Sequence, residues 1–335
     1  MNALALLLFF AAADVRLPYT LVRLDNGATV VLQQDTSMPQ VGVEVWIRGG
    51  AREEAPGQHG TAHLFEHDLP ASGRFLGNAD NRAQRSATSR EGGAGTQYDF
   101  LRFYATASPD GLEPALGYLA DRLESDPAKF SDENVKRDQD IVVSELRRSM
   151  NVDWDLEVRN ALARGTFGAG HPYGHAIGGS ETDVRAANAE SMREWHRRFA
   201  GAANAIVFIV GNFDPARAEA LARHHLGSIP PGRRAPRISE DVPNARTRRE
   251  TLEKDVPQPL TYIAWPVPGW GTADADRLSL LARVLGDRET RAELELWEMA
   301  GALTLRGNDE AKLRQALKRD VTAAELARAK TRLQT

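Results

Sequence analysis

Two histidines and a glutamate in the run His-Leu-Phe-Glu-His have the types and spacing that suit metal chemistry. His63 and His67 are four positions apart, so on a helix their side chains share one face with Cβ atoms about 5–6 Å apart. Two imidazoles at that spacing can bind one metal ion. Glu66 flanks the same face, where a general base for an attacking water would stand. The run predicts a hydrolytic zinc site of the inverted His-x-x-Glu-His type.

A simpler interpretation of the run is that its histidines only cap a helix or face solvent. The context favours metal binding, because the helix is short and follows a glycine-rich loop. The intervening Leu64 and Phe65 are apolar and suit the wall of a partly buried site.

The third ligand must come from elsewhere in the chain. There is no cysteine, so a thiolate ligand is excluded and a carboxylate is the natural choice. Glu145 is the candidate, on a long helix where it shares a face with Ile141 and Val142. That face should be buried, and a bound dication would offset the unfavourable burial of the charge. The alternative is a surface glutamate paired with Arg148 three positions later.

Other polar residues are weaker candidates. Asp138, two turns before Glu145, could hydrogen-bond a liganding histidine, although a solvated aspartate is the alternative. We assign none of the remaining histidines to metal, and for His171 and His175 packing in a turn is the favoured interpretation.

The pattern of apolar residues predicts an α/β mixture without strict alternation, which favours an α+β layer fold. Strands are expected at 28–32, 41–47, 100–107 and 205–210. Helices are expected at 60–69, 110–123, 131–150, 156–163, 188–199 and 214–225.

A second, smaller unit follows a linker at 228–249 that is rich in proline and arginine. One clear strand (260–265) and a helix (274–285) are expected there. A final helix opens with a capping box formed by Thr322 and Glu325.

Composition limits the possible partners and location. With 42% apolar and 26% charged residues and a net charge of −4, the chain has the make-up of a globular protein and no electrostatic reason to bind nucleic acid.

Residues 1–13 end in an apolar run that is too short to span a membrane and is typical of a signal peptide cleaved after Ala13. That predicts a periplasmic or secreted protein. A partly buried N-terminal segment, and a cytoplasmic protein, is the alternative.

Six further segments carry a family resemblance in a consistent order over residues 20–235. They are Leu24–Gly27, Val45–Ala51, Tyr98–Tyr104, Leu119–Arg122, Gly170–Gly174 and Val210–Asp214. With the His-x-x-Glu-His run, they make the chain resemble the insulinase–pitrilysin–processing-peptidase family of zinc endopeptidases, particularly bacterial two-domain members. The resemblance implies one zinc ion per chain, with His63, His67 and Glu145 as ligands and Glu66 as general base.

The resemblance also implies the architecture. A catalytic α+β domain (14–235), with a mainly antiparallel sheet packed by helices in two layers, is followed by a shortened homologous second domain (247–335) that is catalytically silent. The two halves enclose a chamber, and a peptide substrate binds as an added strand on a sheet edge.

Three departures from the family pattern stand out. Gly93–Thr96 replaces a segment that usually carries an asparagine, which leaves Thr96 as a candidate substrate-edge residue. Asp68 adds a carboxylate beside His67. The strands between the first strand and the last helix of the second domain are expected to be deleted.

Two hypotheses follow. The first is a zinc metalloendopeptidase that hydrolyses peptides or unfolded polypeptide segments. The second is a non-catalytic, peptidase-like protein that acts as the partner of a homologous subunit.

Overall fold

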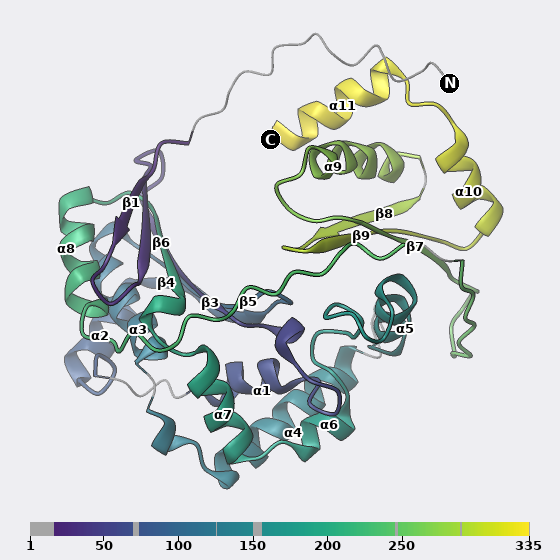
Figure 1. Cartoon of the computed structure of the whole chain (residues 1–335). Helices are drawn as coiled ribbons and strands as arrows, with labels where there is room; N and C mark the ends of the chain where they lie inside the picture. Colours follow the sequence, from purple (N-terminus) through teal and green to yellow (C-terminus); the bar gives the residue numbers. More distant parts are fainter. Residues whose placement is uncertain are drawn as a thin grey trace.

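The computed structural model describes residues 17–69, 74–124, 126–149, 156–244, 247–288 and 290–334. Within these ranges the chain forms two β-sheets, each packed by helices and joined by an extended connection (Figure 1). The predicted signal peptide, 1–13, lies outside the described residues.

The first sheet has six strands in the order β1-β2-β6-β3-β5-β4. In chain order the strands are β1 (Thr20–Arg23), β2 (Thr29–Gln34), β3 (Val41–Arg48), β4 (Ser89–Thr96), β5 (Phe100–Ala107) and β6 (Ala205–Gly211). All pairs are antiparallel except β2 with β6. In β3, Val41, Val43, Val45 and Ile47 alternate with less buried residues and are at most 1% exposed. This period-2 burial is the reason the segment forms a central strand.

Two helices pack on this sheet. Helix α3 (Leu112–Leu123) lies against β3 and β5, and α8 (Pro215–Leu226) lies against β2 and α3. Asp214 caps α8 by accepting a hydrogen bond from Arg217 N, and Pro215 occupies the first turn. The confirmed fold class is therefore α+β, with a mainly antiparallel sheet and a helical layer.

A second group of helices surrounds the predicted metal-binding helix, α1 (Thr61–Asp68). Its neighbours are α4 (Asp132–Ser149), α6 (Glu181–Ala186) and α7 (Ala189–Phe199), and β4 passes beside it. Helix α5 (Leu156–Phe167) follows α4 in the chain and packs against the second sheet at β7.

The second sheet corrects the prediction for this part of the chain. It has three antiparallel strands in the order β7-β9-β8, where one clear strand was expected and the others were thought deleted. The strands are β7 (Thr261–Pro268), β8 (Arg291–Leu296) and β9 (Ala300–Gly307). Helix α9 (Ala273–Gly286) covers one face, and α10 (Glu310–Lys318) and α11 (Ala323–Gln334) follow (Figure 1).

Five further helices and strands were not predicted, namely β1, β4, α2 (Ala79–Thr88), α6 and α10. Strand β4 contains three glycines, and α2 has no buried residue, so neither has the apolar pattern of its type. Strand β1 has only four residues. No helix among the described residues has both the length and the apolar character needed to cross a bilayer.

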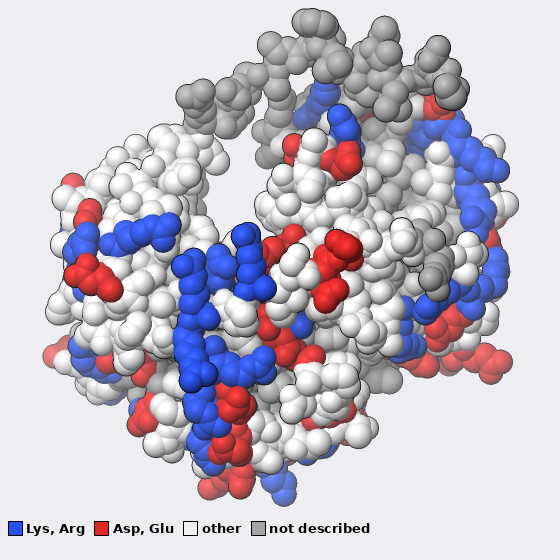
Figure 2. Space-filling model, in the orientation of Figure 1, with Lys and Arg blue, Asp and Glu red and all other residues white. Residues whose placement is uncertain are grey.

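Besides the contact between α5 and β7, the two parts of the molecule meet at a polar and aromatic junction. Arg52 Nη1 lies 2.9 Å from Asp99 Oδ1 and 2.6 Å from Glu298 Oε2. Tyr173 donates a hydrogen bond to Asp99 and accepts one from Met299 N. Away from this junction Figure 2 shows an open hollow between the two parts, with Lys and Arg side chains gathered along one rim.

Candidate metal centre

Helix α1 presents its histidines because its opposite face is buried. Leu64 and Phe65 are 0% exposed and belong to the main hydrophobic core. The 3.6-residue period then turns His63 and His67 toward α4, where their side chains are 19% and 22% exposed. The packing of α1 therefore produces the pair of imidazoles that the sequence predicted.

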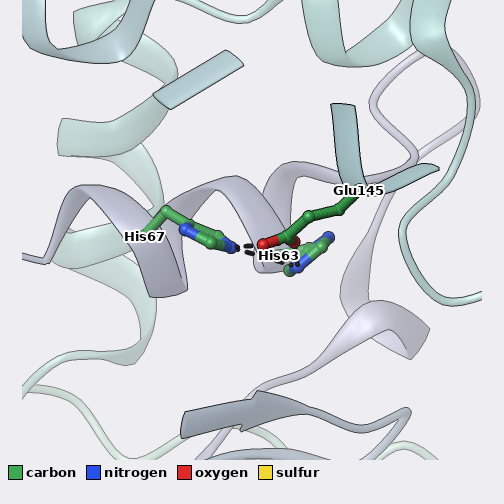
Figure 3. A group of neighbouring side chains, drawn as sticks. All are labelled: His63, His67 and Glu145. Carbon is green, nitrogen blue, oxygen red and sulfur yellow. Dashed lines mark hydrogen bonds and ion pairs between the residues drawn. The ribbon is translucent and has the colours of Figure 1, made fainter. Parts of the chain in front are cut away.

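The structure brings His63, His67 and Glu145 together (Figure 3). The two histidine Nε2 atoms are 3.3 Å apart, and they lie 3.4 Å and 3.3 Å from Glu145 Oε2. Around a tetrahedral zinc with ligands at about 2.0–2.1 Å, neighbouring ligand atoms are about 3.3–3.4 Å apart. The three atoms thus have the spacing of three corners of a zinc coordination tetrahedron, and the donor set of two imidazoles and one carboxylate suits that metal.

Glu145 lies at the margin of the buried face of α4, not within it. Its side chain is 41% exposed, and Ile141 is 40% exposed whereas Val142 is 0% exposed. The expectation that Ile141 marks a buried face was therefore wrong. A hydrogen bond from His63, helped by the charge of His67, lowers the pKa of the Glu145 carboxyl below its usual value.

The alternative pairing of Glu145 with Arg148 is not what the structure shows. Arg148 donates to the backbone and side-chain oxygens of Ser144, and the neighbouring Arg147 pairs with Glu181. The Glu145 carboxylate is left to the two histidines.

Glu66 is held by a residue of the neighbouring strand. Thr96 Oγ1 donates a hydrogen bond of 2.7 Å to Glu66 Oε2. Thr96 was predicted as a substrate-edge residue, and the structure places its hydroxyl on the candidate general base.

Asp138 has other contacts than the predicted one. It is 2% exposed and accepts two hydrogen bonds from Arg137, at 2.9 Å and 3.0 Å. It also faces Asp68, and burial together with the Asp138 charge raises the pKa of Asp68 to about 7. The two carboxyl groups, one at the end of α1 and the other on α4, face each other. A hydrogen bond that Asp138 accepts from a liganding histidine stays a prediction.

A buried glutamate that the sequence analysis missed fixes the start of α1. The helix begins at Thr61, and its N-cap residue, Gly60, has no side chain that could cap it. Glu54, whose side chain is 0% exposed, accepts hydrogen bonds from Gly60 N and Ala62 N at 2.9 Å and 2.8 Å. His175 Nε2 lies 3.1 Å from the same carboxylate. Packing in a turn was the favoured interpretation of His175. The structure shows that its side chain also contacts Glu54, which caps the candidate metal-binding helix.

With this geometry in place, comparison with known proteins places the chain in a family. The family model described as Insulinase (Peptidase family M16) matches residues 29–178, and the model described as Peptidase M16 inactive domain matches residues 186–306. The two matches cover most of the chain. The protein belongs to the insulinase family of peptidases, as the resemblance implied.

Relatives named as zinc proteases support the same conclusion. The uncharacterized zinc protease YmxG of Bacillus subtilis is 27% identical over 192 residues, which cover 56% of this chain and 45% of that protein. An uncharacterized zinc protease of Mycobacterium tuberculosis is 28% identical over 302 residues, covering 84% of this chain and 68% of the relative. The chain thus spans less than half of the first relative and about two thirds of the second.

Other relatives are not named as proteases. Human mitochondrial cytochrome b-c1 complex subunit 1 is 24% identical over 284 residues, covering 83% of this chain and 57% of the subunit.

Among solved structures, a protease from Helicobacter pylori superposes with a TM-score of 0.78 at 18% identity, covering 95% of this chain and 84% of that one. That likeness shows a common fold.

Proposed function

We propose that the protein is a zinc-dependent metalloendopeptidase that hydrolyses peptides or unfolded polypeptide segments. The observation that carries this proposal is the triangle of His63, His67 and Glu145 donor atoms, whose edges of 3.3–3.4 Å fit a single zinc ion. The relatives named as zinc proteases support it.

Each side chain has a defined task in this proposal. His63, His67 and Glu145 hold one metal ion per chain. When bound, the metal supplies Lewis acidity toward the scissile carbonyl and lowers the pKa of a water. Glu66 takes a proton from the attacking water and passes it to the leaving amine. A peptide would reach these groups through the hollow between the two parts of the molecule (Figure 2).

Removal and return of the metal test the proposal. The purified chain should contain about one zinc ion, and it should cleave a quenched fluorescent peptide. A chelator should abolish cleavage, and added zinc should restore it. Cleavage that survives complete removal of zinc would contradict the proposal.

A second candidate function is that of a non-catalytic partner subunit. It is favoured by the similarity to cytochrome b-c1 complex subunit 1 and by the match to a family model described as inactive. The same peptide assay distinguishes the two, if it is run on the chain alone and mixed with a longer homologue. Cleavage that appears only in the mixture supports the subunit role.

We also propose export from the cytoplasm, on the strength of the apolar run at residues 3–13 and its Ala-x-Ala ending. Mass spectrometry of the protein from a bacterial host should find a mature chain that begins at Asp14. An intact Met1 in protein recovered from the cytoplasm would contradict export.

A further inference from the structure

Thr96 joins the edge strand of the first sheet to the candidate general base. It is the last residue of β4, is 9% exposed, and is held in register opposite Leu101 of β5. Its hydroxyl donates the 2.7 Å hydrogen bond to Glu66 Oε2. Among the hydrogen bonds of the described residues, this is the one that the Glu66 side chain makes.

We propose that Thr96 is a positioning residue for Glu66, fixing the carboxylate through Oε2 so that Oε1 is the oxygen that accepts the proton from water. This inference rests on the proposed function, because it assigns Glu66 the role of general base.

The Thr96 side chain is conformationally more restricted than the Glu66 side chain, as a positioning residue must be. Glu66 is a long side chain on a partly exposed face of α1, so without a partner it would sample several rotamers. Thr96 is β-branched and sits in a strand, where χ1 is restricted. Its burial limits competition from water for the hydroxyl. The less mobile residue therefore sets the orientation of the more mobile one.

The hydrogen bond should affect turnover, not metal or substrate binding. Thr96 is not one of the three residues whose donor atoms converge on the metal position. A hydrogen bond from a neutral hydroxyl to a carboxylate is of the stronger, charge-assisted kind. Its loss should lower kcat by about ten- to a hundredfold and leave KM nearly unchanged.

Three variants test this. Thr96→Val keeps the shape of the side chain but removes the donor, Thr96→Ser keeps the donor, and Thr106→Val makes the same change on the neighbouring strand β5. Zinc content, melting temperature, kcat and KM are measured for each. The expected result is a fall in kcat for Thr96→Val alone, with Thr96→Ser close to the native enzyme. Crystals of zinc-loaded Thr96→Val should show Glu66 in more than one orientation.

The outcomes separate the two proposals. If the native chain cleaves peptide and Thr96→Val has an unchanged kcat, this inference is wrong and the proposed function stands. If Thr96→Val loses zinc or fails to fold, Thr96 has a structural role and the inference is again wrong. If the zinc-loaded native chain cleaves no peptide, the proposed function fails and this inference fails with it.

Discussion

Glu145 is the residue that would complete the proposed metal site, and it comes from a different helix than the two histidines. Its carboxylate oxygen lies within 3.4 Å of both Nε2 atoms. Two imidazoles alone would leave a zinc ion with too few protein ligands for a closed or catalytic site. Because Glu145 lies outside α1, a substitution at Glu145 tests its contribution to zinc binding without changing the two histidines.

Glu145→Gln keeps the size of the side chain and removes its charge. We expect zinc affinity to fall by at least about a hundredfold, since changes even to groups behind the ligands reduce it by about 10–100-fold. Competition with a zinc chelator of known affinity measures the effect. Glu181→Gln, which alters a surface pair with Arg147, is the control, and an equal affinity in the two variants would exclude Glu145 as a ligand.

At the scale of elements, α1 depends on a cap that comes from outside the helix. Glu54→Ala would leave Gly60 N and Ala62 N without their acceptor and His175 without its carboxylate. Buried donors without partners destabilise the folded state, so the free energy of unfolding should fall by about 2–4 kcal/mol. Urea denaturation measures this, with Glu240→Ala at an exposed position as control. A loss no larger than that of the control would show that Glu54 does not stabilise the helix.

The last helix, α11, is held by a glutamate with a pH-dependent contribution. Glu325 is 6% exposed, accepts two hydrogen bonds from Arg288, and forms the predicted capping box with Thr322. These bonds lower the pKa of Glu325 well below its usual range. A lowered pKa in the folded state means that the unfolded chain binds the proton more tightly. The stabilisation is therefore complete above the unfolded pKa of about 4.5 and is lost as the pH falls below it.

Melting temperatures of the native chain and Glu325→Gln should differ at neutral pH and converge in acid. The native chain should melt higher at about pH 7, and the gap should narrow as the pH drops below about 4. Differential scanning fluorimetry across this range checks the trend. A gap that stays constant with pH would show that the Glu325 charge is not responsible.

How far the sequence predicts these elements depends on how each is stabilised. Strand β5 was predicted with its observed bounds because its apolar residues alternate, and the His63–His67 spacing pointed to the cluster that the structure brings together with Glu145. Strand β4 could not be found, since its glycines carry no pattern, and with it the Thr96–Glu66 contact was hidden. The contact between Glu54 and His175 joins residues 121 positions apart, and such pairing depends on the tertiary fold. Strand β8 carries an alternation that could have been recognised, since Leu294 and Leu296 each follow a glutamate.

At the scale of the whole molecule, the polar junction around Arg52 connects the two parts of the chain through ion pairs. The Arg52 side chain is 3% exposed and faces three carboxylates, those of Glu53, Asp99 and Glu298. Arg52→Met would leave these charges without their buried counterion, and breaking such a buried pair costs about 3–5 kcal/mol. We expect faster cleavage of the connection at 230–260 in limited proteolysis. Arg237→Met, at the exposed end of the same cluster, should have little effect, and equal cleavage of the two variants would contradict this role for Arg52.

The central claim is that the site on α1 and α4 hydrolyses peptide bonds with Glu66 as general base. The most direct test compares the native chain with Glu66→Gln, both loaded with an equal amount of zinc, on one unfolded polypeptide substrate. The account predicts that Glu66→Gln binds zinc as the native chain does and loses at least about a hundredfold in kcat. Equal rates for the two proteins, or no cleavage by the zinc-loaded native chain, would contradict it.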